Sequence, residues 1–143
     1  MDVAAFIAYV RAHGDAVLST LGPEGEPQAA FLSITATDLG ELVFDAKDAS
    51  RKIQNLRRDP RVAIVLGGAD GTTMQVQGVA DIPAGVDLDR CAAAYARAFP
   101  EFADSLVNPK VTVVRVAVAW ARHGDYRSKP PQVSTVDLSS MTD

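Results

Sequence analysis

The first apolar pattern along the chain has helical spacing. Val3, Phe6, Ile7 and Val10 fall on one stripe and Gly14 follows them, so residues 2–13 are predicted to form an amphipathic helix. A second stripe predicts a helix over residues 87–99, and its members are Leu88, Cys91, Ala92, Tyr95 and Phe99. Both helices are expected to place one apolar face against a core.

Most other apolar residues occur in short runs that are bounded by turn residues. The turn signals include residues 22–27 and 67–71, which are dense in glycine, proline or acidic residues. Six strands are predicted, over residues 16–21, 28–37, 41–46, 61–66, 72–82 and 111–120. Because the strands are linked mostly by tight turns and do not alternate with helices, the pattern predicts a mainly β protein, an antiparallel barrel with peripheral helices.

The polar segment after the third predicted strand begins another helix, which starts near Ser50 and ends before Pro60. Arg51 and Lys52 fall in its first turn, where the helix dipole already places positive charge, at a cost of about 0.3–1 kcal/mol. A phosphate would offset this cost, because free backbone N–H groups, the Ser50 hydroxyl and two cations would converge on it. The alternative interpretation is a solvated helix start.

Composition and charge limit the domain organisation and the classes of partner that the chain is expected to have. With 143 residues the chain is expected to form one domain, over residues 1–128, followed by a flexible tail over residues 129–143 that is rich in serine, threonine, proline and aspartate. The net charge of −4 argues against nucleic-acid binding. No apolar segment approaches the ~20 residues that span a bilayer, and no signal peptide is recognised, so a cytoplasmic protein without membrane contact is expected.

Few residues outside the helix start carry recognisable chemistry. Cys91 is the only cysteine, which excludes an internal disulfide, and it lies on an apolar stripe. His13 and His123 have no second ligand at helical spacing, so no metal site is predicted. The sequence has no nucleophile elbow, dinucleotide fingerprint or Walker loop. The catalytic residues therefore stay unassigned.

Several short motifs occur in an order that is typical of one family. They are Leu18-Ser19-Thr20, Gly25-x-Pro27, a strand that reaches Phe44, Ser50-Arg51-Lys52, Asn55-Leu56, Asp59-Pro60-Arg61-Val62 and Gln77-Gly78-Val79-Ala80. In this order the chain resembles the pyridoxamine 5'-phosphate oxidase-like family of FMN-binding split-barrel proteins, over about residues 3–122. The resemblance implies a six-stranded antiparallel split β-barrel that forms a homodimer, with the cofactor in a cleft at the subunit interface.

The resemblance also implies roles for individual residues. Arg51 and Lys52 match the residues that hold the flavin phosphate, and Ser50 precedes them as in the oxidases. The strand over residues 30–35 matches the one along the flavin ring and ribityl chain, so Ser33 and Thr35 would face the cofactor or be the polar side of a strand. The remaining matched positions are Asp45 and Ala46, which contact the cofactor largely through backbone, and Trp120, which lies near the flavin or in the core.

The C-terminal region departs from the oxidases. Their Arg-x-His-Asp-Arg pattern, which grips the pyridoxine substrate, is replaced here by Arg122-His123-Gly124-Asp125-Tyr126-Arg127. We therefore do not expect pyridoxamine phosphate as the substrate. The leading hypothesis is an FMN-dependent oxidoreductase that transfers hydride at the flavin N5 to or from an unidentified small molecule. The alternatives are an F420-dependent reductase and a non-catalytic flavin- or haem-binding protein.

Overall fold

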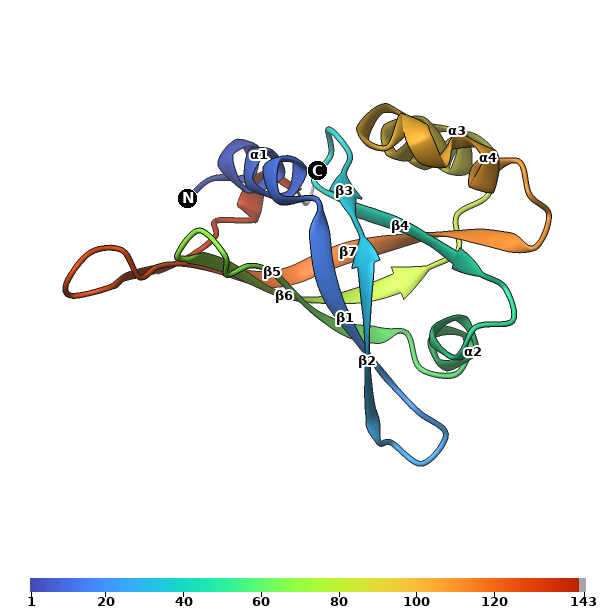
Figure 1. Ribbon diagram of the computed structural model, residues 1–143, viewed down its shortest axis with the longest axis horizontal. Coiled ribbons are helices and arrows are strands. Elements are labelled where there is room, and N and C mark those ends of the chain that lie inside the picture. Colours follow the sequence, from blue (N-terminus) through green and yellow to red (C-terminus); the bar gives the residue numbers. More distant parts are fainter. Residues whose placement is uncertain (142–143) are drawn as a thin grey trace.

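A single antiparallel sheet organises the computed structural model of the protein, which describes residues 1–141 (Figure 1). The strands are β1 (Asp15–Leu21), β2 (Pro27–Ser33), β3 (Thr35–Ala36), β4 (Leu42–Lys47), β5 (Arg61–Gly67), β6 (Thr72–Asp81), β7 (Val111–Asp125) and β8 (Gln132–Thr135). Their order in the sheet is β2-β1-β5-β6-β7-β4-β3, and β8 pairs with β7. The sheet curls into a half-barrel, which is the predicted split-barrel fold.

Helices lie on two sides of the sheet. The helical elements are α1 (Val3–His13), α2 (Arg51–Arg58), α3 (Gly85–Ala98), η1 (Pro100–Phe102), α4 (Ala103–Leu106) and η2 (Ser139–Met141). Figure 1 shows α1, α3 and α4 along one side of the molecule and α2 on the other, beside the β1–β2 hairpin. No helix in residues 1–141 is long and apolar enough to span a membrane.

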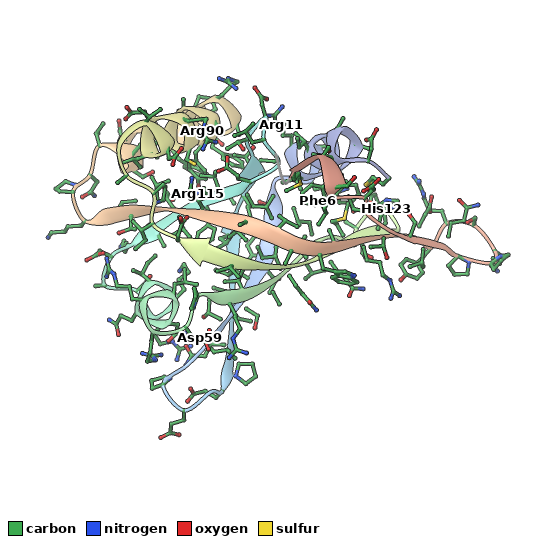
Figure 2. The ribbon with its side chains drawn as sticks, turned by 180° about the vertical axis from the view of Figure 1, so that it is seen from behind. Phe6, Arg11, Asp59, Arg90, Arg115 and His123 are labelled. Atoms are coloured by element: carbon green, nitrogen blue, oxygen red, sulfur yellow. The ribbon has the colours of Figure 1, made fainter. Side chains whose placement is uncertain are left out.

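The core lies inside the curl of the sheet. Burial alternates strictly along β5, so Val62, Ile64 and Leu66 point inward, and Phe6 of α1 packs against the same cluster (Figure 2). Burying a large apolar side chain contributes about 1.5–3 kcal/mol, so this cluster is the main source of stability. Cys91 is buried in a second cluster beneath α3, as its apolar stripe predicted.

The outer face of the sheet stays exposed over β1, β2, β5 and β6. The pairs Val17–Phe31 and Val17–Val65 lie side by side on this face, and Val79 continues it on β6. We call this surface the open face. It carries apolar side chains that the described residues of one chain do not cover.

Residues 1–141 form eight strands, whereas six were predicted. The two additional strands arise because their pairing partners are distant in sequence. The strand predicted over residues 28–37 divides at Ile34, whose backbone N–H donates to the Gly14 carbonyl at 2.8 Å. Before this residue the chain pairs with β1, and after it β3 pairs with β4. The eighth strand, β8, falls in the segment that we expected to be a tail.

The predicted tail over residues 129–143 contains the strand β8 and the short helix η2 within residues 129–141, and residues 142–143 lie outside the described part. Residues Gln132–Thr135 form β8, which pairs with the C-terminal end of β7. Val136 is buried, and its backbone N–H donates to the Ala121 carbonyl. The strand β7 runs to Asp125, beyond the predicted end at residue 120, and its last residues pair with β6 on one side and β8 on the other. The division into a domain over residues 1–128 and a tail stays a prediction.

Candidate functional site

Helix α2 begins at a residue whose hydroxyl has no partner. Ser50 is the N-cap and has an extended backbone, yet its side chain makes no capping hydrogen bond. Its Oγ is the buried side-chain polar atom within residues 1–141 that lacks any hydrogen-bond partner. An unsatisfied buried hydroxyl costs about 1–3 kcal/mol, so its presence at this helix start is compatible with a missing ligand.

Two later cations of this region, Arg57 and Arg61, are held by acidic neighbours. Arg57 donates to Asp48 at 2.7 Å, and this hydrogen bond is the main cause that lowers the pKa of Asp48. Arg61 binds Asp59 through two nitrogens, and these bonds lower the pKa of Asp59 to about 2. Figure 2 shows Asp59 near the end of α2. These cations therefore stabilise local structure.

Arg51 and Lys52 differ from Arg57 and Arg61 in their lack of partners. Neither side chain has a hydrogen-bond or ion-pair partner in the part of the chain that the structure describes. Both line a cavity of about 180 Å³ between α2 and the β1–β2 hairpin. The other lining residues are Leu18, Thr20, Gln28, Ala29 and Ala30. The cavity thus combines two free cations with polar groups from two strands.

Asn55 ties the wall of this cavity together. It lies one helical turn after Arg51 and is only 3% exposed. Its Nδ2 donates to Thr20 Oγ1 at 2.9 Å and to Gln28 Oε1 at 3.0 Å. Its Oδ1 accepts from Arg58 at 2.8 Å. A buried amide with all these bonds fixes α2 against β1 and β2.

The open face carries a larger hollow of about 520 Å³. Its lining includes Ser19, Gln75, Gln77, Trp120 and Tyr126. A second hollow, of about 420 Å³, shares Ser19 and Gln77 with the first and includes Thr20, which also lines the α2 cavity. Trp120 belongs to neither core cluster and lines this hollow, whereas its predicted place near a flavin stays a prediction.

A β-bulge in β7 shapes the two hollows of the open face. The register between β6 and β7 shifts after Gln77, which pairs with Trp120, whereas Gly78 pairs with Val118. Ala119 is therefore the extra residue on β7. Bulges of this kind bend a strand and reorient its side chains.

Four other residues that were predicted to contact the cofactor do not line the α2 cavity. Thr35 is 2% exposed and lines a separate cavity of about 250 Å³ with Arg11 and Arg97. The Asp45 carboxylate accepts a hydrogen bond from Ser105 at 2.5 Å, toward α4. Ala46 is part of the core. Ser33 ends β2 opposite Asp15.

The structure therefore brings Arg51 and Lys52 to one cavity with Ala30 of the predicted strand, and Ser50 to the adjoining helix start. It does not bring the side chains of Thr35 or Asp45 there. The roles predicted for all these positions stay predictions. Sequence reasoning did not assign Thr20 and Asn55, although each is a polar residue at an inward position of its element.

Both histidines lie away from the α2 cavity. His13 Nε2 is 2.9 Å from Asp70, and its Nδ1 is 2.8 Å from the Tyr9 carbonyl. Burial is the largest single effect and opposes protonation, but the two hydrogen bonds and the negative charge of Asp70 together raise the pKa of His13. The ring of His123 meets Tyr9 edge-on. Residues 1–141 contain no cluster of three potential metal-binding side chains.

Comparison with known proteins places the chain in a family. The sequence matches the pyridoxamine 5'-phosphate oxidase family over residues 3–124, which is most of the chain. The protein therefore belongs to the pyridoxamine 5'-phosphate oxidase-like split-barrel family, as the order of its motifs predicted. A comparison with curated protein sequences gives no match.

Solved structures support the same fold. A haem-binding protein from Mycobacterium smegmatis is 23% identical with a TM-score of 0.81. That alignment covers 97% of this chain but only 58% of the haem-binding protein, so this chain spans little more than half of its length. A conserved hypothetical protein from Mycobacterium tuberculosis is 27% identical with a TM-score of 0.74, over 89% of this chain and 86% of the other. A haem storage protein from Vibrio cholerae is 17% identical with a TM-score of 0.69, over 82% and 91%. The likeness to the two haem proteins concerns the fold alone.

Proposed function

We propose that the protein binds FMN and acts as a flavin-dependent oxidoreductase. The observation that carries this proposal is the cavity lined by Arg51 and Lys52, which have no acidic partner within residues 1–141, beside the Ser50 hydroxyl, which has no partner among the same residues. A phosphate dianion would supply the missing acceptors and offset the positive charge at the helix start. The residues present thus suit the phosphate end of the cofactor.

The open face suits the other end of a flavin. Ser19, Gln75 and Gln77 offer neutral hydrogen-bonding groups, and Trp120 and Tyr126 offer aromatic surface. Bound flavin would supply hydride transfer at its N5, whereas these residues would bind, orient and shield the ring. The deazaflavin F420 also presents a phosphate, so it is the first alternative cofactor.

We also propose that two copies of the chain pair through the open face. Phe31 is 73% exposed there, next to the exposed Val17 and Val65 in the neighbouring strands, and Val79 is exposed further along the same face on β6. Contiguous apolar surface of this kind is typical of an interaction site. A homodimer would cover this surface and enclose the hollows, so the cofactor would bind at the interface.

Haem binding is the second candidate, because two proteins with this fold are named as haem-binding or haem storage proteins. A haem iron is most often held by an axial side chain such as histidine. His13 is engaged with Asp70 and the Tyr9 carbonyl, and His123 pairs with the buried Met74, on the inner side of β7. Neither histidine lines the hollow at Trp120, whereas His13 lines a separate hollow of about 560 Å³ with Val17 and Phe31. The pair of cations in the α2 cavity suits a phosphate and makes a flavin the first candidate.

The test compares cofactor affinities of the Arg51→Ala/Lys52→Ala variant and the unmutated protein. Hydrogen bonds to charged groups contribute about 1.5–3 kcal/mol each, so the FMN dissociation constant should rise at least about 100-fold. Riboflavin, which lacks the phosphate, should bind both proteins equally. The control is Arg57→Ala, which removes a cation of the same helix that is paired with Asp48. Unchanged FMN affinity in the double variant would contradict the phosphate site.

A further inference from the structure

The orientation of the Asn55 amide is fixed by chemistry. A guanidinium can only donate hydrogen bonds, so the atom of Asn55 that contacts Arg58 must be the oxygen. The nitrogen therefore faces Thr20 and Gln28, and it supplies the hydrogen in both bonds. Each of the amide's two N–H groups is used once, so Asn55 has no donor left.

This orientation decides the role of the Thr20 hydroxyl. Because Thr20 Oγ1 accepts from Asn55, its own hydrogen must be donated elsewhere. Thr20 is 3% exposed, and no acceptor for its hydrogen is found among residues 1–141. The residue lines the cavity of Arg51 and Lys52. A buried donor without an acceptor thus lies at the wall of a cavity that already holds two free cations.

From this geometry we infer that the Thr20 hydroxyl is a third donor to the bound phosphate, and that Asn55 is a positioning residue that sets its direction. The ligand class is a phosphomonoester dianion, whose three terminal oxygens accept several hydrogen bonds. The inference rests on the proposed flavin phosphate site. It adds a neutral donor from β1 to the charged donors of α2, so the phosphate would bridge the helix and the hairpin.

A purely structural role for Thr20 gives a different expectation. In that case its oxygen would serve only to accept from Asn55, and losing it would lower stability without favouring one flavin over another. The ratio of the riboflavin and FMN dissociation constants separates the two roles. Loss of folded protein weakens both ligands alike, whereas loss of a phosphate contact weakens FMN alone.

The experiment titrates FMN and riboflavin into the cofactor-free protein and follows quenching of flavin fluorescence. Thr20→Val keeps the shape of the side chain and removes the hydroxyl, and it should weaken FMN about tenfold while riboflavin changes less than twofold. Thr20→Ser keeps the hydroxyl and should preserve the ratio. A Thr20→Val protein with the unmutated ratio would overturn the inference.

Asn55→Asp tests the positioning role, because a carboxylate accepts from both Arg58 and Thr20 and so turns the hydroxyl away from the phosphate. The substitution also adds a negative charge. Comparing the double variant Asn55→Asp/Thr20→Val with Thr20→Val measures the effect of this charge, because both proteins lack the hydroxyl. The two substitutions should be less than additive on FMN affinity, because they remove the same donor. Full additivity would contradict a shared donor. Two results would contradict the proposed phosphate site itself, and the inference with it. One is an unmutated protein that does not prefer FMN over riboflavin, and the other is an Arg51→Ala/Lys52→Ala variant that retains this preference.

Discussion

Arg51 and Lys52 are recognisable from the sequence because their significance is local. A cation in the first turn of a helix is unfavourable wherever the helix lies, so the pattern alone predicts an anion site. The structure adds that Arg57 and Arg61 have acidic partners and Arg58 has neutral ones, whereas Arg51 and Lys52 have no side-chain partner within residues 1–141. The selective absence of partners in one turn is what distinguishes a binding residue from a solvated surface charge.

Gly78 is constrained by the close approach of the neighbouring strand β7. A Cβ at this position would lie 2.5 Å from the Ala117 carbonyl oxygen and 2.7 Å from Val116 Cγ1. The first of these atoms is backbone, which cannot move without disturbing the β6–β7 bulge. Gly78→Ala should therefore lower the free energy of unfolding by about 1–3 kcal/mol, as overpacking does elsewhere.

Urea denaturation checks this expectation, with Gln75→Ala as the control because Gln75 is exposed on the same strand. The control should change the free energy of unfolding by less than about 0.5 kcal/mol. A Gly78→Ala protein as stable as the control would contradict the close approach of β7.

At the scale of elements, local patterns predict what each segment forms but not which segment it meets. The strict alternation of β5 and β6 identifies them as half-buried strands, and Pro60 ends α2 near its predicted position. The break at Ile34 is invisible in the sequence, because it depends on the change of partner from β1 to β4. The strand β8 was missed for the same reason, since Gln132–Thr135 is polar, exposed and held by β7.

The same limit applies to the site. Burial and hydrogen-bond partners decide where Thr35 and Asp45 point, and both depend on α3 and α4, which follow much later in the chain. The contact between Asn55 and Thr20 joins residues 35 positions apart, so no spacing rule reveals it. Sequence reasoning therefore locates the cations of the proposed phosphate site, but the structure is needed to find the neutral groups around them.

At the scale of the molecule, the open face predicts self-association. Phe31→Glu places a charge at the most exposed of these apolar side chains, and it should shift the protein from dimer to monomer at micromolar concentration in analytical ultracentrifugation. Val107→Glu is the control, because Val107 is 82% exposed but follows α4, away from this face. A monomeric unmutated protein, or a dimer that Phe31→Glu leaves intact, would contradict the proposed interface.

The proposed function requires the protein to hold a phosphate-bearing flavin. The most direct measurement is the absorption spectrum of the protein as purified, followed by mass spectrometry of the molecule released on denaturation. The account predicts the absorption bands of a flavin and the mass of FMN, or of F420 for the deazaflavin alternative. A haem Soret band without flavin, or a colourless protein that binds neither FMN nor F420 on titration, would contradict it.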